Sequence, residues 1–216
     1  MKFILLSFLL IECSCHLHAQ DIQIKLTLEQ KEELKYNILS KVKELASLID
    51  NLSSTNSLLN REKKLTEIDK GKYLFYEFDR RYIYLTSPRF PKGQKRNMRS
   101  YFHNLIMLSE RYYFVKIEWS DFVIPMDSSI FKFVGYTKTG DVEYEGKAFF
   151  KQIFIEYKLD GFSNREIPTM VKVMENIDAK SVDIRVTITK SKIGNEWKNF
   201  YNIKLGDVHA TLLEYR

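Results

Sequence analysis

The chain has 216 residues, a formal net charge of +6 at pH 7 and an aromatic content of 14%, with 13 Tyr and 15 Phe. This length is typical of one domain plus a targeting segment, and it can bury a hydrophobic core without disulfide bonds. The 8 Gly and 4 Pro exclude a collagen-like or low-complexity chain. Because 28 acidic residues are spread among the 34 Lys and Arg, we expect no nucleic-acid partner, which would require basic residues concentrated on one face.

Residues 1–19 resemble a secretory signal peptide. Lys2 precedes an apolar run over residues 3–11, and Ala19 ends a segment suited to cleavage. The apolar run is shorter than the roughly 20 residues that span a bilayer, so no transmembrane span is expected. We therefore expect export to the periplasm or the cell exterior. The Ala-Gln junction and the following body rich in Lys, Ile, Tyr and Phe resemble exported proteins of the Bacteroidetes type.

Both cysteines, Cys13 and Cys15, lie inside this predicted signal. A chain cleaved after Ala19 has no thiol, which excludes a disulfide, a zinc-thiolate site and a cysteine nucleophile from the mature protein. The alternative is lipoprotein anchoring through Cys13 or Cys15, although the position of Glu12 fits a lipobox poorly.

Three helices are predicted in the first half of the chain. Thr27 and Gln30 have the spacing of a capping box, and the apolar residues that follow recur every three or four positions on one face. These apolar residues are Leu34, Ile38, Val42, Leu45, Ile49 and Leu52. They predict a long helix over 28–52 that packs on a sheet. Shorter helices are expected over 58–69 and 98–110.

Antiparallel strands are predicted over 81–87 and 112–213. The aromatic and β-branched stretch 112–160 is typical of a meander of long strands, and Gly146 within it suggests a bulge or a bend. No linker or internal repeat divides the chain. The sequence therefore predicts a single α+β domain over 20–216, in which N-terminal helices pack on a strongly curved antiparallel sheet.

The segment 87–99 is the one strongly basic stretch, and Pro88 and Pro91 argue against regular structure just after the first strand. Its cations could contact phosphates, anionic lipid or acidic glycans. They are Arg89, Lys92, Lys95, Arg96 and Arg99. The alternative is a solvated loop that leads into the helix over 98–110.

No motif for a nucleotide, zinc or calcium site or for a serine nucleophile is present, and we expect no metal and no cofactor. The mature chain has only His103 and His209, which lack the spacing of metal ligands. A carboxylate in an apolar pocket would have a raised pKa and could act as a base. The carboxylates considered are Glu118, Asp121, Asp127, Glu143 and Glu145. We expect each to be a solvated strand or turn residue, with Asp127 shaping its turn, and no catalytic pair is assigned.

The order of elements resembles the nuclear transport factor 2-like superfamily, in which a bent sheet wraps around helices to form a cone. The matching segments are the apolar stripe 34–52, RYIYLTS at 81–87, the helix 98–110, EWSDF at 118–122 and WKNFYNIKLGDVHAT at 197–211. Members include ketosteroid isomerases and dehydratases, with an acid/base pair in the cone, and binding modules without catalytic residues. No His/Asp arrangement of those enzymes matches this sequence.

We therefore predict an exported, non-catalytic binding module with an aromatic-lined cavity or sheet face. Its partner would be a small molecule, a glycan or a protein, and a homodimer through the sheet is also expected. The candidate ligand-binding residues are Tyr101, His103, Tyr113, Trp119 and Tyr136. The alternatives are an isomerase- or dehydratase-like enzyme with an acid/base residue in the cone, and polyanion binding through 89–99.

Overall fold

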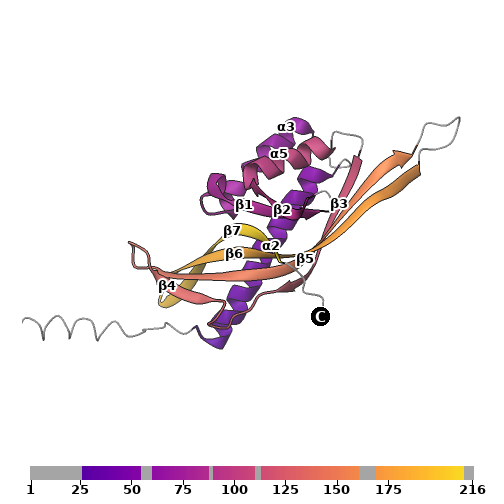
Figure 1. The fold of residues 1–216 in the computed structure, drawn as a ribbon. Helices are drawn as coiled ribbons and strands as arrows, with labels where there is room; N and C mark the ends of the chain where they lie inside the picture. The colour runs from indigo at the N-terminus through magenta and orange to yellow at the C-terminus, as the bar shows by residue number, and fades with distance from the viewer. Residues whose placement is uncertain (1–25, 55–59, 88–89, 110–112, 161–168, 212–216) are drawn as a thin grey trace, which may run out of the picture.

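The computed structural model describes residues 26–54, 60–87, 90–109, 113–160 and 169–211 (Figure 1). The predicted signal peptide, including both cysteines, lies outside these residues. The fold is α+β, and its helices pack on a strongly curved sheet in which antiparallel pairing dominates, as predicted. No helix in the described part of the chain is long and apolar enough to cross a membrane.

The longest helix, α2 (Leu28–Ser53), forms as the sequence predicts and crosses behind the sheet in Figure 1. The capping box is confirmed, because the backbone N–H of Gln30 donates to Thr27 Oγ1 at 3.2 Å and that of Thr27 donates to Gln30 Oε1 at 2.9 Å. The predicted apolar stripe is buried, with Leu34, Ile38 and Val42 fully inaccessible to solvent. This burial, rather than intrinsic helix propensity, holds α2 on the sheet.

Shorter helical segments close one end of the sheet. They are α3 (Arg61–Ile68), α4 (Gly71–Leu74), the 3-10 helix η1 (Phe78–Arg80) and α5 (Met98–Ser109). α3 begins later than predicted because the Asn60 side chain caps it, accepting the backbone N–H of Lys63 at 2.9 Å. Phe75, Phe78 and Phe102 pack together there with ring centroids 5.8 to 6.4 Å apart.

The strands of the sheet are β1 (Tyr82–Ser87), β2 (Phe90–Asn97), β3 (Tyr113–Val123), β4 (Lys132–Tyr136), β5 (Val142–Asp160), β6 (Thr169–Ile193) and β7 (Glu196–Thr211). Their order is β2-β1-β7-β6-β5-β3, and β4 pairs with the free part of the β5 edge. The described pairings between these strands are antiparallel except that of β1 with β7, which is parallel. The prediction of strands over 81–87 and most of 112–213 is thus confirmed within the described residues.

The basic segment was predicted as a loop, and this is wrong for residues 90–97, which form β2. β2 is an edge strand whose only described partner is β1, with Lys95 opposite Tyr84. A proline such as Pro91 is tolerated on an edge strand because its missing N–H can face away from the ladder. Lys95 and Arg96 therefore lie on an edge strand of the sheet, whereas Arg99 belongs to the following helix.

Gly146 was predicted to mark a bulge or a bend, but it pairs regularly with Ile184. The irregularity of the β5–β6 ladder lies instead between Glu156 and Tyr157. Gly146 is buried because the ring of Phe131 packs directly on it, and a β-carbon there would collide with Phe131 Cδ2. Gly146 therefore marks no bulge in the β5–β6 ladder, and its missing side chain makes room for the Phe131 ring.

The core lies between the helices and one face of the sheet. β6 contributes Val182, Ile184 and Val186, all at most 2% exposed, and β7 contributes Ile203, Leu205 and Val208. These side chains meet the apolar stripe of α2 in one hydrophobic cluster. The side of the sheet that faces the helices is thus occupied by the protein's own side chains at its centre.

Candidate functional site on the outer face of the sheet

The structure does not bring the five predicted ligand-binding residues into one site. Tyr101 is buried at 6% exposure, and burial strongly raises the pKa of its hydroxyl, which is hydrogen-bonded to Gln152. Trp119 stacks on Phe150 at 4.3 Å beside the core. His103 is exposed on α5 and Tyr136 is 56% exposed on β4. The fifth residue, Tyr113, belongs to the side chains that the structure does not describe.

The described cations of the basic segment are engaged within the protein. Arg99 pairs with Asp79 at 2.7 Å and Asp69 at 3.4 Å, and its pKa is raised, first by the hydrogen bond to Asp79. Lys95 lies 4.0 Å from the ring centroid of Tyr82. Arg96 donates to Gln94 Oε1 at 3.0 Å. The other two predicted contacts, at positions 89 and 92, fall among the side chains that are not described.

Three of the five carboxylates named in the sequence analysis, Glu118, Asp121 and Asp127, are exposed to solvent, as predicted. Glu118 and Asp121 are exposed on β3 and pair with Lys116 and Lys151 respectively. The hydrogen bond from Lys151 lowers the pKa of Asp121.

Asp127 shapes its turn, also as predicted, because its carboxylate accepts the backbone N–H of Ser129 at 3.1 Å. The other two, Glu143 and Glu145, are half-buried on β5, and Glu145 lines a pocket on the outer face of the sheet.

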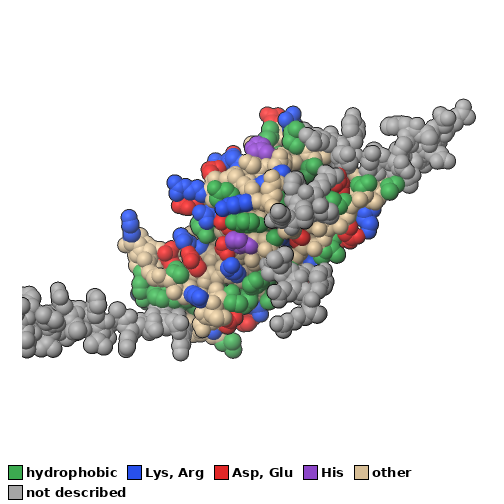
Figure 2. Space-filling view, in the orientation of Figure 1, with side chains coloured by type: hydrophobic (Ala, Val, Ile, Leu, Met, Phe, Trp, Pro, Cys, Tyr) green, Lys and Arg blue, Asp and Glu red, His purple; other side chains and the backbone are tan. Residues whose placement is uncertain are grey.

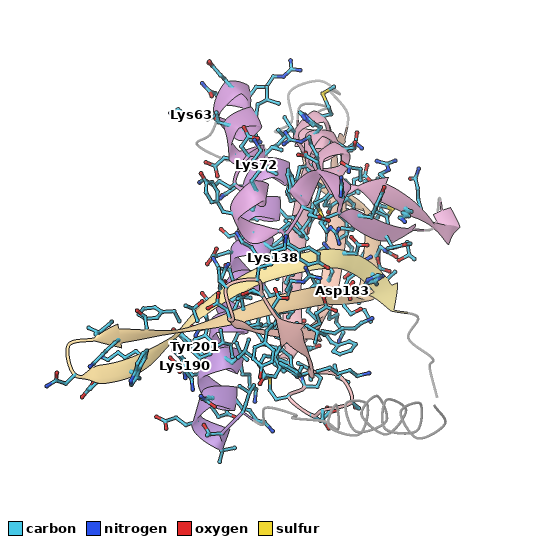
Figure 3. All side chains as sticks on the ribbon, turned by 90° about the vertical axis from the view of Figure 1, so that its left-hand side faces the viewer. Lys63, Lys72, Lys138, Asp183, Lys190 and Tyr201 are labelled. Atoms are coloured by element: carbon cyan, nitrogen blue, oxygen red, sulfur yellow. The ribbon has the colours of Figure 1, made fainter. Side chains whose placement is uncertain are left out.

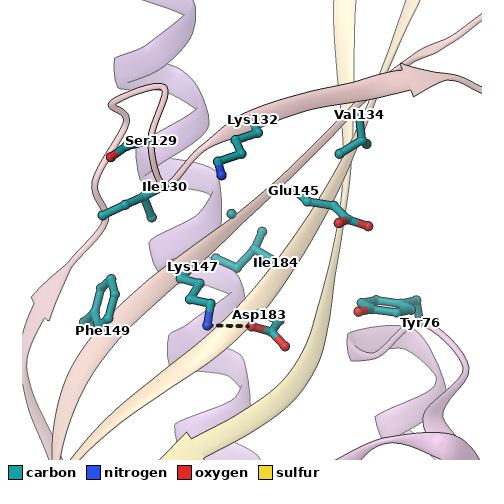
Figure 4. Close-up of a pocket in the computed structure, with 11 residues that line it drawn as sticks. Tyr76, Ser129, Ile130, Lys132, Val134, Glu145, Lys147, Phe149, Asp183 and Ile184 are labelled. Atoms are coloured by element: carbon teal, nitrogen blue, oxygen red, sulfur yellow. Dashed lines mark ion pairs between the residues drawn. The ribbon is translucent and has the colours of Figure 1, made fainter. Parts of the chain in front are cut away.

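This pocket of about 420 Å³ opens where β4 and the turn before it approach β5 and β6 (Figure 4). It is lined by Tyr76, Ser129, Ile130, Lys132, Val134, Glu145, Gly146, Lys147, Phe149, Asp183 and Ile184. Its polar side chains follow from strand alternation: Tyr144 and Ala148 of β5 are buried, so Glu145 and Lys147 point to the opposite, outer face. The same alternation places Asp183 of β6 outward, between Val182 and Ile184.

The charges in this pocket are only partly paired with one another. Asp183 holds His209 Nε2 at 2.9 Å through Oδ2, and Lys147 Nζ at 3.7 Å through Oδ1 (Figure 4). Glu145 accepts from Arg185 at 2.6 Å, and this hydrogen bond raises the pKa of Arg185. Lys132 has no ion-pair partner among the described residues. The pocket therefore offers both donors and acceptors to a polar ligand.

Tyr76 forms one wall of the pocket and is held between two guanidinium groups. Arg81 lies 4.3 Å and Arg185 4.6 Å from its ring centroid. Its hydroxyl passes over Gly206, where a β-carbon would lie 2.7 Å from the Tyr76 oxygen. Burial raises the pKa of Tyr76, and the two arginines oppose that shift. The hydroxyl is thus fixed beside Asp183, whose Cβ is also next to Gly206.

A row of interacting side chains continues from the pocket across the outer face. His209 stacks on Tyr84 at 5.3 Å, and Lys95 lies 5.6 Å from the Tyr84 ring centroid. Together with Asp183 and Lys147, these residues connect β2 to β5, and we call them the outer row. Basic and acidic side chains are interspersed on the face seen in Figure 2, so the surface is of mixed charge.

Sequence reasoning did not identify Tyr76, Asp183 or His209 as a group. Two signals could have found them: the alternation of apolar and polar residues over 181–189, which places Asp183 opposite the apolar face, and Gly206 within a strand, which is typical of a close approach by another segment. The described residues hold no group of three or more His, Cys, Asp and Glu that could bind a metal ion.

Compared with known protein families and with curated proteins, the sequence matches none of either. The geometry and chemistry of the outer face are therefore the basis for assigning a function.

Proposed function

We propose that the protein is an exported, non-catalytic binding module that holds a polar ligand, of which a glycan fits best, in the pocket on the outer face of the sheet. One observation carries this proposal. The helix-facing side of the sheet is packed with buried side chains, whereas the outer pocket of about 420 Å³ is lined by Lys132, Glu145, Lys147 and Asp183. Its volume falls within the usual range of small-molecule sites.

The mixed lining of the pocket supports a glycan over an apolar molecule. A sugar presents hydroxyl groups around its ring and C–H groups on its faces. The ammonium groups of Lys132 and Lys147 can donate to hydroxyls, and the carboxylate of Asp183 can accept from them. Phe149 and Ile130 supply apolar surface in the same pocket.

Export and family membership belong to the same proposal. The signal-like residues 1–19 support export, and the detection of a chain that begins at residue 20 in the periplasm or medium would test it. The packing of helices on a curved sheet supports membership of the nuclear transport factor 2-like superfamily. The expected homodimer through the sheet stays a prediction.

The binding proposal is tested by calorimetry and thermal shift with a panel of neutral and acidic oligosaccharides. We expect at least one glycan to stabilise the protein, and Lys147→Ala to weaken its binding about tenfold, because a hydrogen bond from a charged group is lost. The matched control is Lys172→Ala, which removes another exposed strand lysine. Lys172 does not line the pocket, and its Nζ pairs with Glu175 Oε2 at 2.6 Å.

Two results would contradict this proposal. One is the absence of stabilisation by any oligosaccharide in the panel. The other is a glycan that binds wild type, Lys147→Ala and Lys172→Ala equally well, which would place its site outside the pocket.

Acid–base catalysis is a second candidate because His209 is oriented by Asp183 at 2.9 Å and by its stack on Tyr84. The exposed positions of His103 and Glu118 give no support to an acid/base pair inside the cone. If a bound glycan is recovered unchanged after long incubation, binding is favoured. Conversion that is lost in His209→Gln would favour catalysis.

A further inference from the structure

The hairpin formed by the end of β6 and the start of β7 projects from the body of the protein. Figure 3 shows it extending away from the helices, with Lys190 and Tyr201 along it. Ile193 pairs with Glu196 across a turn in which Gly194 has a φ of +59°, a backbone conformation that glycine adopts readily. Residues 189–200, which we call the tip, are thus a paired hairpin rather than an irregular loop.

This tip exposes large apolar side chains. Trp197 is 70%, Ile193 51% and Phe200 47% exposed. Exposed apolar side chains that gather on one projecting element mark an interaction site more often than scattered ones do. Trp is also enriched where one part of a side chain meets an apolar phase and another meets water.

The charge of the tip is basic. Residues 189–200 carry Lys190, Lys192 and Lys198 against the single acid Glu196. Lys198 is 3.9 Å from Glu196, a loose ion pair, and neither Lys190 nor Lys192 has an ion-pair partner among the residues that the structure describes. Two lysines are therefore free to meet an external anion.

We propose that the tip of this hairpin docks on an anionic lipid surface. Ile193 and Trp197 enter the boundary between headgroups and acyl chains, while Lys190, Lys192 and Lys198 meet the anionic headgroups. A lipid surface fits better than a protein partner because lysine is depleted at protein–protein interfaces, whereas lysine and tryptophan together are typical of membrane interfaces.

The base of the hairpin is rigid enough to carry such a contact. The Tyr201 hydroxyl donates to Glu33 Oε2 of α2 at 2.9 Å, and Ile188 and Ile203 are buried in the core. A hollow of about 470 Å³ lined by Gln30, Lys190, Trp197 and Asn199 leaves room for a headgroup beside the indole. The hairpin therefore presents its tip without having to fold on contact.

Co-sedimentation with vesicles tests the proposal. The full mature chain is mixed with vesicles of phosphatidylglycerol and phosphatidylcholine, or of phosphatidylcholine alone. We expect binding to the anionic vesicles only, weakened by salt. The chain has two Trp, and Trp119 is stacked on Phe150, so a blue shift of fluorescence on vesicle addition reports Trp197 and disappears in Trp197→Phe.

Paired variants separate the charged from the apolar contribution. Lys190→Gln with Lys192→Gln should lower binding to anionic vesicles about tenfold or more, and Ile193→Ser with Trp197→Ser should abolish it. The matched control, Lys43→Gln with Lys63→Gln, removes two exposed lysines from α2 and α3 and should bind as wild type does. Circular dichroism confirms that each variant is folded.

Three outcomes would overturn the proposal: no vesicle binding by the wild type, equal binding to neutral vesicles, or full binding by both hairpin variants. Self-association without lipid that is lost in Trp197→Ser would instead assign the tip to an interface between copies of the chain.

Discussion

Asp183 links the two halves of the outer row because its two carboxylate oxygens have different partners. Oδ2 holds His209 at 2.9 Å, while Oδ1 is 3.7 Å from Lys147. Lys147 can therefore turn toward a ligand without leaving the carboxylate unpaired, whereas loss of Asp183 would remove the partner of both Lys147 and His209. Because of this asymmetry, Lys147→Ala tests glycan binding more cleanly than a substitution of Asp183 would.

Tyr201 provides a pH-dependent test at the same scale. Burial, followed by the hydrogen bond to Glu33, raises the pKa of Tyr201 to about 12 from its usual value of 10.0. Because the pKa of Tyr201 is higher in the folded state than in the unfolded state, the stability that its neutral hydroxyl contributes is fully present below pH 10.0. This contribution is lost as the pH rises through about 12. Tyr201→Phe should lower the free energy of unfolding by about 0.5–1.5 kcal/mol at neutral pH.

Urea unfolding of wild type and Tyr201→Phe across this pH range measures the effect. The difference between the two proteins should shrink above pH 10.0, since the other tyrosines are common to both. A difference that stays constant up to pH 12, or that is absent at neutral pH, would show that the Tyr201–Glu33 hydrogen bond does not stabilise the fold in this way.

At the scale of elements, β5 and β6 carry both the core and the candidate site on one ladder. Buried residues such as Ala148 and Val182 alternate with outward residues such as Lys147 and Asp183. A slip of one residue would exchange the two faces, so the buried face determines the register that assembles the pocket. Strand patterning is therefore what links stability to the site.

The packing of Phe131 on Gly146 yields a prediction for this ladder. Gly146→Ala places a methyl group against the Phe131 ring and should destabilise the protein by about 1–3 kcal/mol. In Phe131→Leu the ring is gone, so adding Gly146→Ala to that variant should cost less than it does in wild type. Thermal unfolding of the four proteins measures the coupling, and strictly additive effects would contradict the contact.

For the whole molecule, α2 and the sheet share a single hydrophobic cluster, so they should unfold together. Leu45 of α2 is fully buried, and Leu45→Ala should lower the free energy of unfolding by about 2–5 kcal/mol. Leu65→Ala, at a side chain 40% exposed, should change it by less than about 0.5 kcal/mol.

Two probes monitor this unfolding in a Trp197→Phe background: far-UV circular dichroism and the fluorescence of Trp119. We expect their transitions to coincide in urea, both in the parent and in Leu45→Ala. Separated transitions would mean that the helices and the sheet form independent units.

The sequence by itself determined the long helix predicted over 28–52, its capping box and the alternation that places Val182, Ile184 and Val186 of β6 on one face. These features depend on periodicities of 3.6 and 2 residues, which are local and legible in one chain. It also predicted the α+β class, because amphipathic helices must cover one face of the sheet, whereas the expectation of a strongly curved sheet came from the resemblance to the nuclear transport factor 2-like superfamily.

Only the tertiary structure decided what the outer face contains. Tyr76, Asp183 and His209 meet because β7 lies between β6 and β1, a pairing of strands distant in sequence that no local pattern specifies. The same holds for Gly146, whose role depends on where Phe131 packs. Side-chain periodicity tells which way a residue points, but long-range strand order decides which residues it meets there.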